Sequence, residues 1–233
     1  MARRIAHKLL GFAVGLAAFI FLALQAWFYA QVLWLRNHDP AQSAFMQEQL
    51  ALLREHNPKA RLQRRWVPYA QISANLKRAV VAAEDAKFLD HQGFDWEAIQ
   101  KAIEKNEREG KVVSGASTIS QQLAKNLFLS GERTWARKGE EALITWMLEK
   151  TLSKRRILEL YLNFAQWGED IFGADAAARH HFGVSPAALT PEQSAWLAAI
   201  LPSPTRYDRG YTTRYLAGRV HTILARMPAA QIP

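Results

Sequence analysis

The sequence predicts a mainly α-helical protein with one N-terminal helix that is long enough to cross a membrane. Three observations support this fold class. No charged residue occurs from Leu9 to Leu35. After this run, apolar residues recur at helical spacing, and few stretches show the alternation of apolar and polar residues that predicts β-strands. About 190 residues follow the apolar run, which is enough to bury one hydrophobic core and few for two domains.

The apolar run at 9–35 predicts a transmembrane helix. About 20 apolar residues cross the hydrocarbon core of a bilayer, and this run is longer. Trp27, Tyr29 and Trp34 gather near its end, as aromatic residues do at a membrane interface. The alternative is a cleaved signal peptide, whose apolar region would have only about 7–15 residues. We therefore expect an uncleaved anchor.

Charge predicts the orientation of this anchor and the kind of partner. Arg3, Arg4 and Lys8 precede the run, so residues 1–8 are expected in the cytoplasm and everything after Arg36 on the far side. The chain has no cysteine, which rules out disulfides and thiol chemistry. Its formal net charge of +9 predicts an anionic partner. Beside a membrane span, this charge favours anionic or phosphate-bearing lipid over nucleic acid.

The sequence predicts a membrane-proximal linker helix at residues 36–64 and the main domain at residues 65–233. Within that domain one helix has apolar residues at the i, i+3, i+4, i+7 spacing of a core-facing helix. These residues are Leu76, Ala79, Val80 and Ala83. A second helix begins with a capping box formed by Thr118 and Gln121, and Gly131 is expected to end it.

Three later helices follow. The spacing predicts a long helix from about Trp135 to Leu152, and Ser153 can cap the next one. The residues expected to face the core in these two helices are Leu143, Ile144, Met147, Leu148, Ile157, Leu160 and Tyr161. Thr190, Pro191 and Gln193 combine an N-cap, a first-turn proline and a capping-box glutamine, and that helix is expected to stop at Pro202.

Glu84 is the first candidate catalytic residue. It follows Val80 by four residues, so it projects from the buried face of its helix. Burial raises the pKa of a carboxyl group, which allows a glutamate to accept a proton near neutral pH. A partly buried glutamate paired with a lysine or arginine is an equally good interpretation of this stretch alone.

Two polar clusters follow, and the first of them could bind an anion. Thr118, Gln122 and Lys125 share one helical face and align a hydroxyl, an amide and an ammonium group near a helix N-terminus. Alternatively, this is an ordinary solvated amphipathic helix. Arg137 and Lys138 both lie on the side of Glu141, at i+4 and i+3 spacing. Alternatively, they form an ion-pair ladder at the surface.

Four blocks of sequence, in this order, resemble the glycosyltransferase domain of peptidoglycan polymerases. This family includes class A penicillin-binding proteins and the monofunctional biosynthetic peptidoglycan transglycosylases. The resemblance extends from about Arg65 to Asp208, and no transpeptidase domain follows it, so we expect the monofunctional form. The matching residues are Glu84, Asp85, Phe88, His91 and Gly93; then Gly115, Ser117, Thr118, Ile119, Gln121, Gln122, Lys125 and Asn126; then Arg137, Lys138 and Glu141; then Lys154, Ile157, Leu158, Tyr161, Leu162 and Asn163.

The resemblance implies a fold, a reaction and a location. The fold would be lysozyme-like, with a smaller membrane-associated lobe for which Phe128, Leu129 and Trp135 are the candidate contacts. In the reaction, the 4-hydroxyl of lipid II attacks the anomeric carbon of a glycan linked through pyrophosphate to undecaprenol, with inversion. The domain would lie in the periplasm, anchored in the bacterial inner membrane. Expected partners are lipid II, the undecaprenyl-linked glycan, the membrane and cell-wall synthesis or cell-division proteins, but not nucleic acid.

The same resemblance assigns roles to residues. Glu84 would be the general base, Glu141 would assist at the leaving group or the attacked sugar, and Lys125, Arg137 and Lys138 would stabilise the pyrophosphate. No metal-ligating residues and no cofactor are predicted, although Mg²⁺ or Mn²⁺ is compatible with the chemistry. The other residues expected to bind substrate are Asp85, Phe88, His91, Ser117, Thr118, Gln121, Gln122 and Asn126.

Two other functions remain as alternatives. A lysozyme-like hydrolase or lytic transglycosylase would share the fold but would not need three phosphate-binding cations. A non-catalytic membrane-anchored scaffold would not need Glu84 on an apolar face together with Glu141. Adding lipid II would separate these functions, because the glycan chain would grow, be cleaved or stay unchanged.

Overall fold

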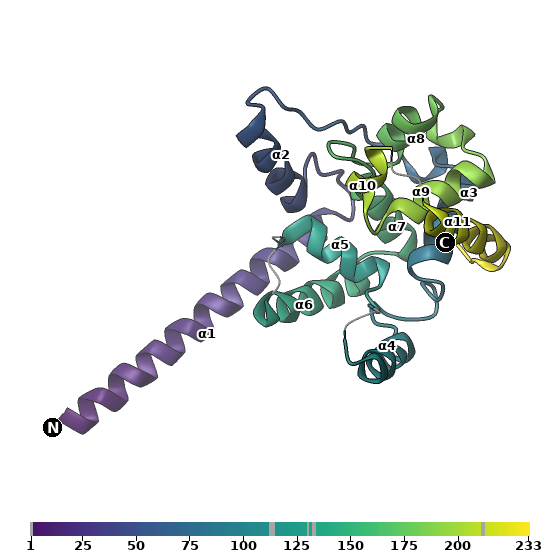
Figure 1. The fold of residues 1–233 in the computed structure, drawn as a ribbon. Coiled ribbons are helices and arrows are strands. Elements are labelled where there is room, and N and C mark those ends of the chain that lie inside the picture. The colour runs from purple at the N-terminus through teal and green to yellow at the C-terminus, as the bar shows by residue number, and fades with distance from the viewer. Residues whose placement is uncertain (1, 112–114, 130, 132–133, 211–212) are drawn as a thin grey trace.

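The computed structural model describes the chain except residues 1, 112–114, 130, 132–133 and 211–212 (Figure 1). It confirms the mainly α-helical fold. In the described part of the chain the only β structure is a pair of isolated bridges. The α-helices are α1 Ala2–Trp34, α2 Ala44–His56, α3 Ala74–Glu84, α4 Trp96–Glu109, α5 Ile119–Phe128, α6 Trp135–Thr151, α7 Lys154–Phe164, α8 Ala174–Phe182, α9 Pro191–Ile200, α10 Pro204–Asp208 and α11 Arg214–Arg226.

Helix α1 extends away from the rest of the molecule (Figure 1). From His7 to Trp34 it is long and apolar enough to cross a membrane. Its last turns contact the domain, because Phe28 packs against Phe128 and the Gln25 amide donates a 2.8 Å hydrogen bond to Glu140 of α6. The side chains of Arg3 and Arg4, on which the predicted orientation partly depends, lie outside the described residues.

The segment 36–64 is not the continuous linker helix that the sequence predicted. Only α2 is helical, because a proline disfavours helical backbone at the residue before it and Pro40 and Pro58 flank this helix. The segment is also fastened to the domain. Arg64 donates hydrogen bonds to the backbone carbonyls of Pro40, Ala41 and Asn163. These residues therefore belong to the folded unit.

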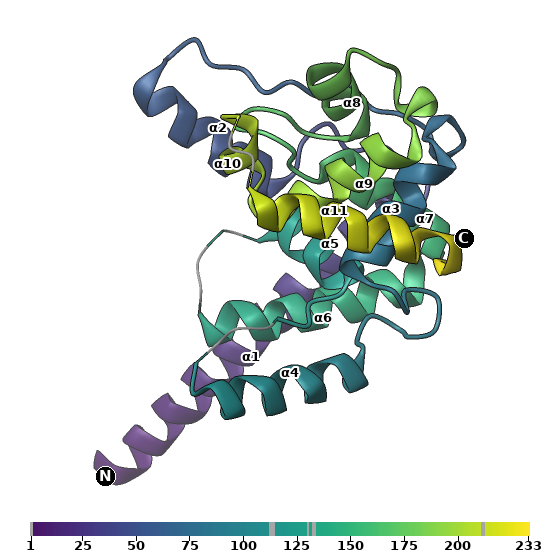
Figure 2. The same cartoon turned by 45° about the vertical axis from the view of Figure 1, so that its right-hand side comes forward.

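The core lies where α3, α9 and α11 pack together and where α5 packs between α6 and α7 (Figure 2). The predicted apolar stripe of α3 is buried there, with Ala83 at its edge. On α6, Ile144, Met147 and Leu148 are buried as expected. Leu143 is 39% exposed, so its prediction was wrong. Thr145 occupies the core-facing position, and a residue two places earlier points to the other side of a helix.

Side-chain caps begin the helices where the sequence predicted them. Thr118 and Thr190 each form a complete capping box, and Ser153 caps α7. Helix α5 ends at Phe128 rather than at Gly131, because Leu129 already adopts extended backbone. These caps fix the start of α5, the helix that carries most of the predicted polar site residues.

Phe128 and Leu129, two of the three expected membrane contacts, are partly covered within the protein. Phe128 meets Phe28 edge to face with ring centroids 5.9 Å apart, and both 128 and 129 are partly buried against the core. Trp135 is 93% exposed, as that expectation requires. A chain cut after residue 36 would lose the α1 surface that covers Phe128.

Gly93 joins the end of the first sequence block to α5 and α6. Its φ is +88°, and a Cβ at this position would lie 2.8 Å from Cγ2 of Thr145. Its carbonyl accepts a 2.7 Å hydrogen bond from the Thr118 hydroxyl. We expect Gly93→Ala to lower the free energy of unfolding by about 1–3 kcal/mol, measured by thermal or denaturant unfolding.

Gly139→Ala on α6 is the matched control, since nothing lies within 4 Å of its Cβ position. Alanine favours a helix interior, so this variant should be as stable as the wild type or slightly more stable. Equal stability of the Gly93→Ala and Gly139→Ala variants would contradict the close packing at Gly93.

Candidate active site

Glu84 is the last residue of α3, and three elements meet at its carboxyl group. Nε2 of Gln122 on α5 donates a 2.9 Å hydrogen bond to its Oε2. Nη2 of Arg219 on α11 donates a 3.1 Å hydrogen bond to its Oε1. The Glu84 side chain is only 12% exposed. The buried orientation predicted from helical spacing is therefore confirmed.

Burial raises the pKa of Glu84 above its usual value. The Gln122 hydrogen bond and the charge of Arg219 lower this pKa, and the nearby charge of Asp85 raises it. The net shift is upward because desolvation is the largest contribution. A carboxylate in this state is a stronger base than an exposed one, as proton abstraction near neutral pH requires.

Tyr161 fixes the orientation of the Gln122 amide. Its hydroxyl donates a 3.0 Å hydrogen bond to Oε1 of Gln122. Burial raises the pKa of Tyr161 well above its usual value, so the hydroxyl keeps its proton and remains a donor. With Oε1 accepting from Tyr161, the amide must present its NH₂ group to Glu84.

Arg219 is the site residue that the sequence analysis missed. It lies three residues after Leu216 and four before Ile223, both buried, so it projects from the apolar face of α11. Its Nε is buried and has no hydrogen-bond partner among the described residues. A charge on an apolar helix face is the signal that singled out Glu84, and the same signal identifies Arg219.

The first sequence block builds the fold around Glu84. Oδ1 of Asp85 lies 2.8 Å from Nε2 of His91, and its Oδ2 accepts a 3.0 Å hydrogen bond from the Ile119 amide. Phe88 is fully buried. Asp85 therefore holds the start of α5 beside the end of α3. This placement favours a positioning role over the substrate contact that the resemblance implied for Asp85, Phe88 and His91.

Thr118 and Gln121 also have a positioning role. Both are buried and satisfy each other in the capping box of α5. Ser117 and Thr118 line the cavity that Glu84 borders, and Gln122, Lys125 and Asn126 line a second one. Ser117, Gln122, Lys125 and Asn126, which take no part in the capping box, remain the candidate substrate contacts on α5 and just before it.

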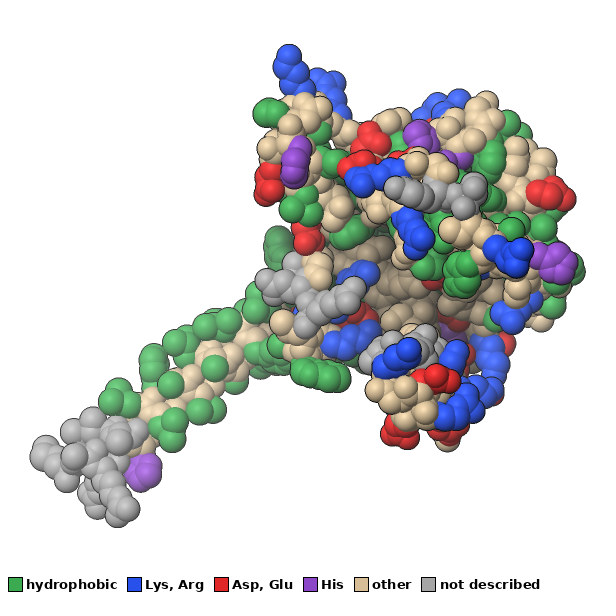
Figure 3. All heavy atoms as spheres, viewed as in Figure 1, with side chains coloured by type: hydrophobic (Ala, Val, Ile, Leu, Met, Phe, Trp, Pro, Cys, Tyr) green, Lys and Arg blue, Asp and Glu red, His purple; other side chains and the backbone are tan. Residues whose placement is uncertain are grey.

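Two cavities flank the hydrogen bond between Glu84 and Gln122. Glu84 lines one of about 290 Å³, which Ser117 and Arg226 also border. Gln122 lines the other, of about 230 Å³, together with Lys125 and Asn126. Figure 3 shows a hollow in the face between α11 and α4, with Lys and Arg side chains around it. Each partner of this hydrogen bond thus borders its own cavity.

Glu141 forms a second group on α6. Nη1 of Arg137 donates a 2.9 Å hydrogen bond to its Oε2, and Lys138 pairs with its Oε1. Glu141 is 3% exposed and the Arg137 side chain 16%, so this ion pair is largely buried, whereas the Lys138 side chain is 41% exposed. No hydrogen bond among the described residues joins this group to Glu84. Helix α6 does pack against α5, which carries Gln122 and Lys125.

Three metal-ligand side chains lie close together elsewhere. His180, His181 and Asp208 on α8 and α10 each offer one ligand atom, and these atoms lie within 4.8 Å of one another. Nε2 of His180 is 2.6 Å from Oδ1 of Asp208, and burial lowers the pKa of His181. None of the three belongs to the predicted site.

Comparisons with known proteins place this geometry in a family context. A family model described as transglycosylase matches residues 50–228, beginning inside α2. Three proteins named biosynthetic peptidoglycan transglycosylase are similar over most of their length. That of Janthinobacterium sp. (strain Marseille) is 52% identical over 99% of this chain and 100% of its own. That of Azoarcus sp. (strain BH72) is 56% identical over 94% of each chain, and that of Nitrosomonas europaea is 57% identical over 91% of this chain and 87% of its own.

Proposed function

Because the chain belongs to the transglycosylase family, it is a peptidoglycan glycosyltransferase, and we propose that Glu84 is the general base with which it lengthens glycan strands from lipid II. The observation that carries this proposal is the Glu84 carboxyl group. It is held by Gln122 and Arg219, its pKa is raised by burial, and it borders one cavity while its partner Gln122 borders another. Transfer between two lipid-linked saccharides needs a space on each side of the base.

In the proposed step, Glu84 takes the proton of the acceptor 4-hydroxyl. The hydroxyl oxygen bonds to the anomeric carbon of the donor sugar, and the bond from that carbon to the pyrophosphate oxygen breaks. Attack from the side opposite the leaving group inverts the anomeric centre. The undecaprenyl pyrophosphate leaves with the negative charge, which nearby cations stabilise in a site that is partly shielded from water.

The proposed donor side is the cavity that Lys125 lines, because an ammonium group there can meet the leaving pyrophosphate. The acceptor side is then the cavity of Glu84 and Ser117. Arg219 has a positioning role: its charge lowers the pKa of Glu84 against the effect of burial, which keeps the resting carboxylate ready to accept a proton.

We propose that Glu141 aims Arg137 and Lys138 at the developing negative charge. Both of its oxygens are engaged by these two cations. Arginine presents a planar guanidinium group whose donors match phosphate oxygens. Here the buried Glu141 carboxylate holds the guanidinium group of Arg137 in place. Mg²⁺ or Mn²⁺, where either contributes, would bind the substrate pyrophosphate, because Glu84 and Glu141 are already paired within the protein.

One N-terminal apolar helix fits a single-pass anchor for a cell-wall enzyme. We propose that residues 1–8 lie in the cytoplasm and that the catalytic domain faces the periplasm, at the inner membrane. The basic residues before the span support this orientation. Lipid II carries its saccharide just above the bilayer, so the two cavities must be held at headgroup height.

An exposed apolar face on α6 is the proposed membrane contact. Trp135, Leu143 and Trp146 lie on one side of this helix at i, i+8 and i+11 spacing, and all three are exposed. Trp96 and Ile103 are exposed on α4, which lies on the same lower side of the domain as α6 (Figure 2). Helix α6 packs against α1, so it is among the parts of the domain nearest to the bilayer that α1 enters.

We expect the double substitution Trp135→Ser and Trp146→Ser to lower the rate of glycan synthesis in proteoliposomes several-fold without changing the unfolding temperature. Both side chains are largely exposed, so their loss costs no core contact, but the domain loses its interfacial orientation. Tyr215→Ser is the control, since this exposed aromatic lies on α11. A double variant as active as the Tyr215→Ser control would show that the α6 face does not contact the membrane.

The proposed function is tested with purified full-length protein in liposomes that contain lipid II. We expect long glycan strands to form, with one undecaprenyl pyrophosphate released for each glycosidic bond made. Shortening of preformed strands would instead indicate a cleaving enzyme. No change in either substrate would indicate a scaffold.

A further inference from the structure

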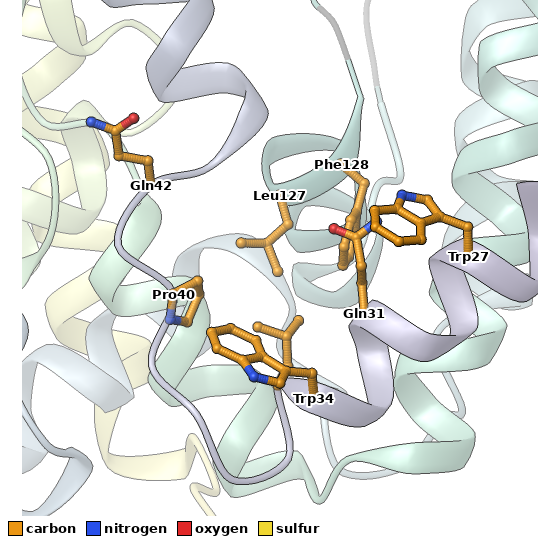
Figure 4. Close-up of a pocket in the computed structure, with 8 residues that line it drawn as sticks. Trp27, Gln31, Trp34, Pro40, Gln42, Leu127 and Phe128 are labelled. Atoms are coloured by element: carbon orange, nitrogen blue, oxygen red, sulfur yellow. The ribbon is translucent and has the colours of Figure 1, made fainter.

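An apolar cavity of about 260 Å³ lies where α1 meets α5 (Figure 4). Trp34, Pro40 and Leu127 line one side of it, and Trp27, Gln31 and Phe128 line the other. Trp27 and Trp34 are on the last turns of α1, at the level where a spanning helix leaves the hydrocarbon core. The cavity therefore opens at the membrane surface.

Helix α5 connects this cavity to the active site. Gln122, Lys125 and Phe128 follow one another at intervals of three residues, so each is a neighbour of the next on the helix surface. Gln122 contacts Glu84, Lys125 lines the proposed donor cavity, and Phe128 lines the apolar cavity. Along α5, the contact with the proposed base is therefore followed by an ammonium group and then by an apolar cavity. Each step of three residues advances about 4.5 Å along the helix axis.

The order of these groups matches the order of groups in a lipid-linked donor, which is sugar, pyrophosphate and hydrocarbon chain. We propose that the cavity between α1 and α5 holds the prenyl units of the donor that are closest to its pyrophosphate. This proposal rests on the proposed function, which supplies the lipid-linked donor. In this arrangement α1 forms one wall of the substrate site in addition to anchoring the domain.

The test uses the full-length protein in proteoliposomes and a lipid II analogue with a photoactivatable group in the prenyl unit next to the pyrophosphate. We expect the probe to label peptides that contain 27–35 and 127–128. Unlabelled lipid II should reduce this labelling. A phospholipid with the same group in an acyl chain should label these peptides weakly.

Gln31→Trp adds bulk inside the cavity and should reduce the labelling and raise KM for lipid II about tenfold, the order expected when one or two methylene groups lose their contact. Its kcat should stay within a few-fold of the wild type. Leu33→Trp is the matched control, because Leu33 lies on the same helix, is 44% exposed and does not line the cavity. This variant should keep the wild-type KM.

Two results would overturn the proposal. One is normal glycan synthesis without labelling of the 27–35 and 127–128 peptides by the lipid II probe. The other is labelling by the phospholipid probe that lipid II does not displace, because a bilayer lipid would then occupy the cavity. Both measurements use the wild-type protein, so they hold even if Gln31→Trp fails to fold. Absence of any glycan synthesis by the wild type would instead reject the proposed function.

Discussion

Glu84→Gln is expected to lower kcat for glycan synthesis by about 10²–10⁴-fold, the usual contribution of a general base. The amide keeps the shape of the side chain, but its one oxygen can accept a hydrogen bond from only one of Gln122 and Arg219, and it cannot accept the hydroxyl proton. The unfolding temperature should fall modestly, because Arg219 loses its ion-pair partner while the packing of the side chain is kept. Initial rates with lipid II and thermal unfolding together measure both effects.

Glu159→Gln is the matched control for this prediction. Glu159 is also partly buried, at 15% side-chain exposure, and it pairs with Arg156 as Glu84 pairs with Arg219. It lies on α7 and lines neither of the two cavities, among the residues that the structure describes. We expect the Glu159→Gln variant to keep its kcat within about tenfold of the wild-type value. If a folded Glu84→Gln variant also kept its kcat within this range, Glu84 would be excluded as the base.

Glu141→Gln is expected to lower kcat about 10²-fold while KM for lipid II changes by less than a few-fold. The expected loss is of the size seen when one aimed charge-stabilising group is removed, because Arg137 and Lys138 would lose the carboxylate that directs them. Groups that act only in the transition state change kcat and leave KM alone. Steady-state kinetics in proteoliposomes separates the two constants.

Stability must be controlled in this experiment, because removing one partner of a buried ion pair destabilises a protein. Glu149→Gln offers a matched control on the same helix, since Glu149 is 5% exposed and pairs with Lys154 at 2.8 Å. We expect Glu149→Gln to lose a similar amount of stability and to keep its kcat. A rise in KM in proportion to the fall in kcat for Glu141→Gln would make Glu141 a substrate-binding group.

Much of the fold could be predicted because its signals are local. The starts of α5, α7 and α9 follow from a capping residue and the few residues after it. Helices α4 and α11 were missed because their apolar faces are narrow: only Ala102 is buried on α4, and only Leu216 and Ile223 on α11. The segment 36–64 was predicted as helix from its composition, and its prolines override that preference.

The site was predictable only within single helices. Helical spacing gave the buried direction of Glu84 and the pairing of Glu141 with Arg137 and Lys138. It could not show that Arg219, 135 residues away, completes the Glu84 group. Nor could it show that Asp85 accepts a hydrogen bond from the Ile119 amide of the next block, because this contact exists only in the folded chain.

The pH dependence of kcat/KM in the wild type, Glu84→Gln and Arg219→Gln tests most directly whether Glu84 accepts the proton. A general base works only when deprotonated, so the wild-type rate should rise with pH through a pKa above the usual value for glutamate. Arg219 lowers that pKa, so its removal should move the rising limb to higher pH, and Glu84→Gln should lose the limb. A limb that stays at the same pH in Arg219→Gln, or that persists in Glu84→Gln, would contradict the assignment.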